Sequence, residues 1–170
     1  YRPEDLRFTP TAVDAIRLLN DSGYRVFVVT NQAGVAKGLY DEAAVHTFHA
    51  AMQARLRQQG AVITAFYHCP FHPVHGVGVY KRESDERKPN PGMLLRAAKD
   101  LGLDLRKSVM VGDKMTDMEA AFNAGVGMKV LFKGKGEQSQ NTAHGLVDAS
   151  IVDLRDVIKI LSGHLGSDEY

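Results

Sequence analysis

The chain has 170 residues, of which 44% are hydrophobic, enough for one domain with a substantial core. Its 21 basic and 20 acidic residues give a formal net charge of +1, which excludes a bulk electrostatic attraction to nucleic acid or to an anionic membrane. The single cysteine, Cys69, excludes an internal disulfide framework and favours a reducing, cytoplasmic setting. No apolar run approaches the roughly 18 residues that a membrane span requires.

Hydrophobic periodicity predicts strands that alternate with helices along the chain. Short β-branched or aromatic runs predict strands, and apolar residues spaced by three and four predict helices. The predicted helices cover residues 9–22, 41–59, 92–101, 116–124 and 154–161, and the predicted strands cover 24–30, 63–68, 108–111, 128–132 and, more weakly, 146–151. This order predicts an α/β fold with a parallel sheet between two layers of helices, in which the apolar run 24–30 is buried on both faces.

Residues 69–91 break the periodicity. The segment is rich in proline and charge, and its length is typical of a functional loop, so we expect an irregular active-site loop there. The rest of the sequence shows no internal repeat and no interdomain linker. The whole of residues 1–170 is therefore predicted to form a single domain.

Three polar clusters follow predicted strands or share their edge of the sheet. They are TNQAGVAKG (30–38), ERKPNPG (86–92) and GDKMTD (112–117). In an open parallel sheet, ligands bind beyond the carboxyl ends of the strands, where loops converge and helix N-termini offer free N–H groups. All three clusters are suited to a phosphorylated ligand.

The first two clusters carry groups that bind phosphate. Thr30 offers a hydroxyl, and the backbone amides of Asn31 and of the glycine-bearing turn can surround phosphate oxygens. Arg87 can hold a phosphate with two hydrogen bonds, and Lys88 can act as a point charge on a transferred phosphoryl group. Each cluster also has a plain structural alternative, a permissive turn for the first and a solvated basic loop for the second.

The third cluster combines two kinds of residue. Asp113, after a buried strand, is placed to bind Mg²⁺, and Lys114 is placed to bind the substrate phosphate. Thr116 and Glu119 match a helix capping box, and Asp117 in the first turn would interact favourably with the helix dipole. Capping accounts for these last three residues, but not for Asp113 and Lys114.

Together the clusters resemble those of the haloacid dehalogenase superfamily of phosphatases. The stretches VVTNQAGVAKG, HCPFHP, RKPNPGML and MVGDKMTDMEAA are similar to the D-glycero-D-manno-heptose-1,7-bisphosphate phosphatases and to the related histidinol-phosphate phosphatases. The likeness covers nearly the whole chain, and three colinear motifs make it specific. It implies a Rossmannoid three-layer sandwich around a central parallel sheet, without a large cap domain.

The resemblance also implies roles for individual residues. It implies that Thr30 and Lys88 stabilise the transferred phosphoryl group. It also implies that Asp113 binds Mg²⁺, with Asp117 as a supporting acidic residue. The implied substrate contacts are Asn31, Gln32, Ala33, Arg87 and Lys114.

The implied reaction is Mg²⁺-dependent hydrolysis of a phosphate monoester through an aspartyl-phosphate. The best single substrate is heptose 1,7-bisphosphate, converted to heptose 1-phosphate, and histidinol phosphate is the nearest alternative. The 3′-phosphatase domains of polynucleotide repair enzymes share a TNQ-x-G stretch, but the lack of a basic patch argues against a nucleic-acid substrate. We therefore expect a small phosphorylated sugar as partner, no nucleic acid or membrane, and a monomer or small homo-oligomer.

The sequence departs from the family at the nucleophile. The family uses an Asp-x-Asp pair at the end of its first strand, whereas Asp14 and Asp21 lie on a predicted helix and Asp5 follows no apolar run. That strand is central to the sheet, so its absence would leave a cavity lined by apolar residues, and such a cavity lowers the stability of the fold. We expect the nucleophile in a segment upstream of Tyr1; if the natural chain begins at Tyr1, a non-catalytic phosphosugar-binding domain is the alternative.

The second departure concerns zinc. Relatives bind structural zinc through C-x-H and C-x-C pairs, of which Cys69 alone remains, and Phe71, Ser84 and Glu86 occupy the other positions. Because zinc selects thiolate and imidazole ligands, we expect no structural zinc of the family type. A different metal site is left open by the residues His68, Cys69, His72 and His75.

Overall fold

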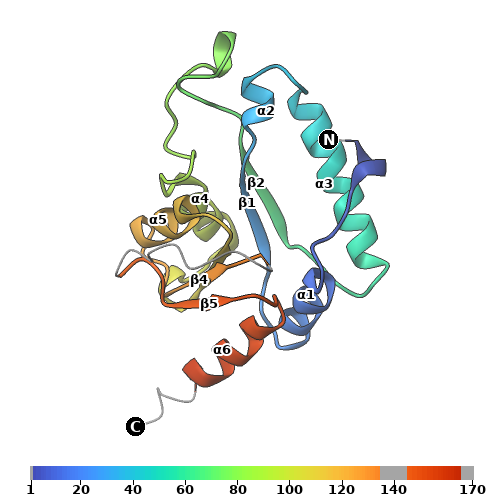
Figure 1. Cartoon of the computed structure of the whole chain (residues 1–170), viewed down its shortest axis with the longest axis vertical. Coiled ribbons are helices and arrows are strands. Elements are labelled where there is room, and N and C mark those ends of the chain that lie inside the picture. The colour runs from blue at the N-terminus through green and yellow to red at the C-terminus, as the bar shows by residue number, and fades with distance from the viewer. Residues whose placement is uncertain (1, 135–144, 166–170) are drawn as a thin grey trace.

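Helices and strands alternate along the chain as the periodicity predicts (Figure 1). The computed structural model describes residues 2–134 and 145–165. The helices are α1 (Ala12–Asp21), α2 (Ala33–Ala36), α3 (Glu42–Arg57), α4 (Gly92–Leu101), α5 (Met115–Asn123) and α6 (Asp156–Leu165), and the strands are β1 (Phe27–Asn31), β2 (Ala65–Cys69), β3 (Val109–Gly112), β4 (Met128–Phe132) and β5 (Ala149–Ile151). Three short 3-10 turns, at Pro3–Asp5, Gly78–Tyr80 and Leu105–Lys107, and the short helix α2 were not predicted.

Local signals in the sequence set the ends of the longer helices. The Asp41 carboxylate accepts a hydrogen bond of 2.7 Å from the Ala44 N–H, which caps α3. Helix α4 ends at Leu101, and its C-cap Gly102 has a φ of 61°, in the left-handed region that glycine adopts without strain. Helix α4 and strand β4 have the bounds that the sequence predicts.

The strands form two separate parallel sheets. Strand β1 pairs with β2, which sets Thr30 opposite His68, and β4 lies between β3 and β5. Among the described residues, no strand pairing joins β1 to β3. The single central sheet that the resemblance implies is therefore interrupted here between β1 and β3.

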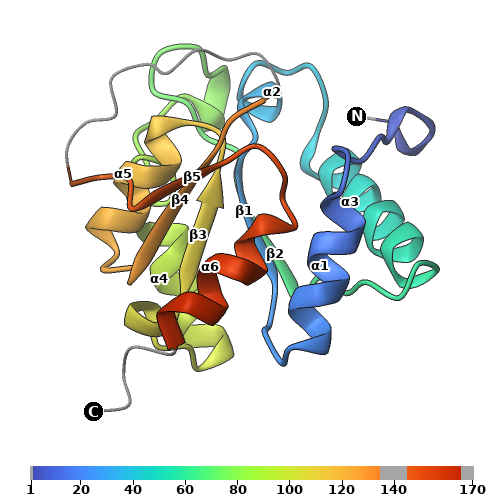
Figure 2. The ribbon, with the colours of Figure 1, turned by 60° about the horizontal axis from the view of Figure 1, so that its bottom comes forward.

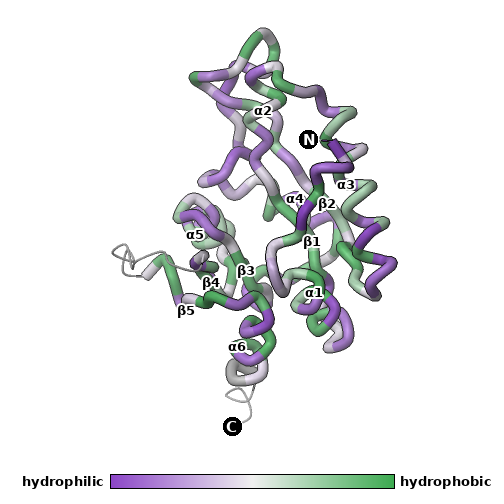
Figure 3. The backbone as a smooth tube through the Cα atoms, turned by 45° about the vertical axis from the view of Figure 1, so that its right-hand side comes forward, coloured by the Kyte–Doolittle hydropathy of each residue, from purple (hydrophilic) through white to green (hydrophobic). Residues whose placement is uncertain are grey.

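A groove of about 680 Å³, called here the central groove, lies between the two sheets. It is lined by residues 26–30 on one side and 108–113 on the other, and by apolar side chains of α1 and α6. Figure 2 shows α1 and α6 side by side next to these strands. Figure 3 shows that the strands β1 and β3 consist largely of hydrophobic residues. The prediction that 24–30 is buried on both faces is wrong: of these residues only Val29 is buried and Arg25 is exposed, because the segment borders this groove.

Clusters of buried apolar residues form the core of the described part of the chain. The largest cluster packs β2, α4 and α5 around Met93, Met118 and Cys69, and a second packs β4 and β5 against α6. A third, with Leu56 and Ile63, lies under α1 and α3. The largest cluster also includes Val29 of β1 and Met110 of β3, so it connects the two sheets on the side of α4 and α5. None of the described helices is long and apolar enough to cross a membrane.

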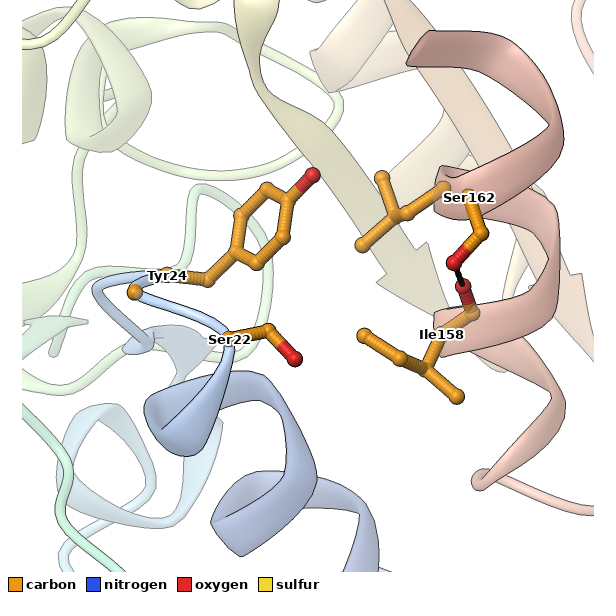
Figure 4. Close-up of a pocket in the computed structure, with 6 residues that line it drawn as sticks. Ser22, Tyr24, Ile158 and Ser162 are labelled. Atoms are coloured by element: carbon orange, nitrogen blue, oxygen red, sulfur yellow. Dashed lines mark hydrogen bonds between the residues drawn. The ribbon is translucent and has the colours of Figure 1, made fainter. Parts of the chain in front are cut away.

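A smaller hollow of about 260 Å³ opens at the amino end of β1 (Figure 4). Ser22 and Tyr24 lie on one side of it, and Ile158 and Ser162 of α6 on the other. The Ser162 hydroxyl donates a hydrogen bond of 2.9 Å to the Ile158 carbonyl. The described residues that line this hollow include no carboxylate or basic side chain, so it lacks the groups that charged chemistry requires.

Candidate active site

The carboxyl end of the central groove gathers residues from all three polar clusters. Thr30 lies near the end of β1, Asp113 directly follows β3, Asp117 lies in the first turn of α5, and Lys88 precedes α4. All four line the central groove. The parallel topology brings them together, because the carboxyl ends of β1 and β3 meet at the same edge.

Lys88 is held by its backbone and by its ammonium group. The side-chain amide of Asn31 donates to the Lys88 carbonyl and accepts from the Lys88 N–H, both at 3.0 Å. The Lys88 Nζ donates to the Val29 carbonyl at 2.8 Å and lies 2.7 Å from the Asp117 Oδ1. An ammonium group has three N–H donors, so Lys88 can bind one further acceptor at the groove. The amide of Asn31, which the resemblance assigns to substrate, positions Lys88 in this structure.

Asp117 joins the ion pair to the start of α5. Its Oδ2 accepts a hydrogen bond of 3.1 Å from the Lys114 N–H, the N-cap position of the helix. The predicted capping by Thr116 and Glu119 is therefore wrong: α5 begins at Met115, and the carboxylate of Asp117 satisfies the N-cap amide. Gly112 makes the room, since a Cβ there would lie 2.4 Å from the Asp117 Cβ.

Asp113 offers the site a carboxylate open to a hard cation. Its side chain is exposed beyond the end of β3, whereas the oxygens of Asp117 are engaged by Lys88 and by the N-cap amide. Within the described part of the chain, no three His, Cys, Asp or Glu side chains converge as a metal-binding group. Mg²⁺ needs only one or two carboxylates together with phosphate and water, so the donor set present at Asp113 fits Mg²⁺.

The remaining predicted contacts are distributed around the rim. Gln32 is buried and bonds to Thr30 and Tyr40, and Ala33 opens α2 behind it. Arg87 does not line the groove; its Nη1 donates to the Phe71 carbonyl at 3.0 Å. Lys114 is exposed at the start of α5. Their contact with a substrate stays a prediction.

The irregular segment 70–91 is fastened to the helices beside the site (Figure 1). The Val77 N–H donates to the Ala36 carbonyl at 2.8 Å, and the Tyr80 hydroxyl donates to the Glu42 carboxylate at 2.9 Å. This hydrogen bond, and then partial burial, raises the pKa of Tyr80 above its usual value, so the hydroxyl stays a donor. The other Glu42 oxygen lies 3.1 Å from the His68 Nε2. Sequence patterns gave no sign of this anchor, because its members lie in three different elements.

His68, Cys69, His72 and His75, the residues of the alternative metal site, have separate surroundings. His68 is paired with Glu42, and Cys69 is completely buried in the core. His72 and His75 pack their rings 4.7 Å apart, and burial, followed by the charge of Arg87, lowers the pKa of His72.

Comparison with known proteins agrees with this arrangement. A family model described as HAD-hydrolase-like matches residues 86–156. The D-glycero-alpha-D-manno-heptose-1,7-bisphosphate 7-phosphatase of Burkholderia mallei is 44% identical over 141 residues, which cover 83% of this chain and 73% of that protein. This chain belongs to the heptose-bisphosphate phosphatase family of HAD-like hydrolases.

Two further heptose-bisphosphate phosphatases extend the comparison. The D-glycero-beta-D-manno-heptose-1,7-bisphosphate 7-phosphatase of Escherichia coli K12 is 39% identical over 159 residues, which cover 92% of this chain and 83% of that enzyme. The crystal structure of the D,D-heptose 1,7-bisphosphate phosphatase of B. bronchiseptica, complexed with magnesium and phosphate, matches with a TM-score of 0.79 and 30% identity, covering 96% of this chain and 88% of that one. These matches confirm the predicted family, the α/β fold and the phosphatase class.

Proposed function

We propose that this protein hydrolyses the 7-phosphate of D-glycero-D-manno-heptose 1,7-bisphosphate to give heptose 1-phosphate, with Mg²⁺ as cofactor. The observation that carries the proposal is the meeting of Thr30, Lys88, Asp113 and Asp117 at the carboxyl end of one groove, in a chain of this family. A hydroxyl, an ammonium group and an open carboxylate are the groups that a phosphoryl transfer requires from its surroundings.

The residues of the site divide the reaction between them. The remaining N–H of Lys88 and the hydroxyl of Thr30 donate hydrogen bonds to the equatorial oxygens of the phosphoryl group, whose negative charge they offset. Arg87, Lys114 and the backbone at Ala33 supply contacts to the rest of the substrate. When bound at Asp113, Mg²⁺ supplies further positive charge to the phosphate oxygens.

The central groove has the shape and the lining that one additional parallel strand requires. Both its walls are strand edges with apolar side chains, their carboxyl ends lie together, and β1 and β3 are unpaired to each other within the described residues. We infer that a strand ending in a carboxylate fills the groove in the active enzyme, with that carboxylate beside Lys88 and Asp113. Its oxygen would attack phosphorus as the sugar oxygen leaves, and water would then release phosphate.

The function is tested by phosphate release from the complete gene product. With Mg²⁺ present, the α and β anomers of heptose 1,7-bisphosphate should each be compared with histidinol phosphate, because relatives named for both anomers are similar to this chain. We expect the highest kcat/KM for one anomer of the heptose bisphosphate, and loss of activity with EDTA. A folded protein that releases phosphate from none of these substrates would contradict the proposal.

The strand is tested separately by hydrogen exchange. If it pairs with β1 and β3, groove-side amides of both strands should exchange more slowly in the complete gene product than in residues 1–170 alone, since pairing protects amides. The amides of β4, which already has two neighbours, serve as the control. Equal exchange in both proteins would show that no strand enters the groove.

A further inference from the structure

A chain of hydrogen bonds leads from Tyr40 to Thr30. The Tyr40 hydroxyl donates to the Gln32 Oε1 at 3.0 Å, and the Gln32 Nε2 donates to the Thr30 Oγ1 at 3.2 Å. Gln32 connects them from a buried position, with 4% of its surface exposed. A buried side-chain amide has to satisfy both its ends, so its neighbours determine which way it points.

The chemistry of the amide gives this chain a direction. The amide nitrogen of Gln32 can donate a hydrogen bond but cannot accept one. The Thr30 oxygen therefore acts as the acceptor, and its own proton is left to donate elsewhere. Thr30 lines the carboxyl end of the central groove, so a phosphoryl group bound there would offer it an acceptor oxygen.

The Tyr40 hydroxyl supports this orientation of the amide by donating to its oxygen. The Gln32 oxygen accepts from the Tyr40 hydroxyl, and the nitrogen end of the same amide faces Thr30. An amide turned the other way would set its oxygen against Thr30, which would then donate to Gln32 instead of to the ligand. The orientation of Gln32 thus decides where the Thr30 proton goes.

Gly34 supplies a second, independent observation. A Cβ built at Gly34 would lie 2.2 Å from three atoms of the Tyr40 phenol, including its hydroxyl oxygen. The phenol therefore occupies the space that any other residue at this position would fill, and this lets it reach Gln32. The turn after β1 is shaped around the Tyr40 hydroxyl.

We propose that Tyr40 is a positioning residue that, through Gln32, fixes the Thr30 hydroxyl as a hydrogen-bond donor to the transferred phosphoryl group. This inference rests on the proposed phosphatase function. A donor fixed in advance is worth most where negative charge develops, so the effect belongs in kcat rather than in KM.

The test replaces the hydroxyl of Tyr40 in the complete gene product. With heptose bisphosphate and Mg²⁺, Tyr40→Phe should lower kcat about tenfold and change KM less than about twofold, the loss of one well-placed hydrogen bond. The affinity for orthovanadate, which resembles the transition state, should fall by the same factor. Tyr67→Phe is the matched control, since its hydroxyl bonds to Asp100 at 3.4 Å, away from the groove, and should leave kcat unchanged.

A second pair of variants separates positioning from general damage. In a Thr30→Val background the hydroxyl is absent, so adding Tyr40→Phe should lower kcat no further. Gly34→Ala, which drives the phenol away from Gln32, should repeat the kcat loss of Tyr40→Phe with KM kept. This variant keeps the test open if Tyr40→Phe folds poorly.

Each result decides the matter. Unchanged kcat and vanadate affinity in Tyr40→Phe, or losses that multiply in the Tyr40→Phe/Thr30→Val double variant, would overturn the inference. If the wild type binds orthovanadate but hydrolyses no sugar phosphate, the proposed function fails, while the vanadate affinity of Tyr40→Phe still tests the role of Tyr40. A wild type that neither hydrolyses a sugar phosphate nor binds orthovanadate overturns both.

Discussion

The ion pair between Lys88 and Asp117 should carry much of the stability of the site. The two side chains are only 11% and 7% exposed, and their charged atoms lie 2.7 Å apart. Asp117→Asn keeps the shape and an acceptor oxygen for the Lys114 N–H, but leaves the buried ammonium group without its counter-charge. The substitution therefore isolates the charge of Asp117.

The expected cost follows from burial. Removing one partner of a buried pair costs about 3–5 kcal/mol, and we expect about 3 kcal/mol here because Lys88 keeps its bond to the Val29 carbonyl. In a chain of this size, that corresponds to a fall in Tm of about 6–12 °C. Urea denaturation followed by circular dichroism gives the free energy of unfolding, with Tm from a thermal scan as a second measure.

An exposed pair in α6 is the matched control. Lys159 and Asp156 lie 2.6 Å apart, but their side chains are 78% and 35% exposed, so Asp156→Asn should cost less than about 1 kcal/mol. The Lys88→Met/Asp117→Asn double variant should be less destabilised than the sum of its single variants. A cost for Asp117→Asn as small as that for Asp156→Asn, or full additivity in the double variant, would refute the assigned role of burial.

Three further substitutions have clear expected outcomes. Asp113→Asn should abolish Mg²⁺-dependent phosphate release while leaving Tm within a few degrees, and retained activity would show that the metal binds elsewhere. Gly112→Ala should destabilise the protein by about 1–3 kcal/mol in urea, because the new Cβ would lie 2.6 Å from the Asp117 Oδ2; an unchanged midpoint would show that this turn yields easily. Burial, and then the charges of two neighbouring histidines, lowers the pKa of His49 from 6.5 to about 4. The unfolded chain therefore binds this proton more tightly than the folded chain does. The free energy of unfolding should fall by up to about 3 kcal/mol as the pH falls from about 6.5 to 4. His49→Phe, which can keep the stacking on Phe66, should flatten the stability profile across that range, and an unchanged slope would assign it to other groups.

The sequence by itself determined the order of the longer helices and of the strands, and it predicted that the three polar clusters meet at one edge of the sheet. Periodicities of two and 3.6 residues are local, so α4 and β4 were predicted with their observed bounds. The rule that parallel strands collect ligands at their carboxyl ends placed Thr30, Lys88 and Asp113 on one edge, where the structure brings them together. Their roles in catalysis stay predictions until the variants are measured.

Only the tertiary structure decided which of these side chains form hydrogen bonds and ion pairs with one another. The capping motif at Thr116 and Glu119 matched the sequence rule, yet the Asp117 carboxylate takes the N-cap amide, because a glycine across the turn lets it approach. Likewise the partners of Lys88, Gln32 and Glu42 lie on other elements, where packing and not spacing along the chain sets distances. The division of the sheet by the central groove has the same cause: a strand's own sequence shows that it is apolar, but not whether a neighbour lies on each of its edges.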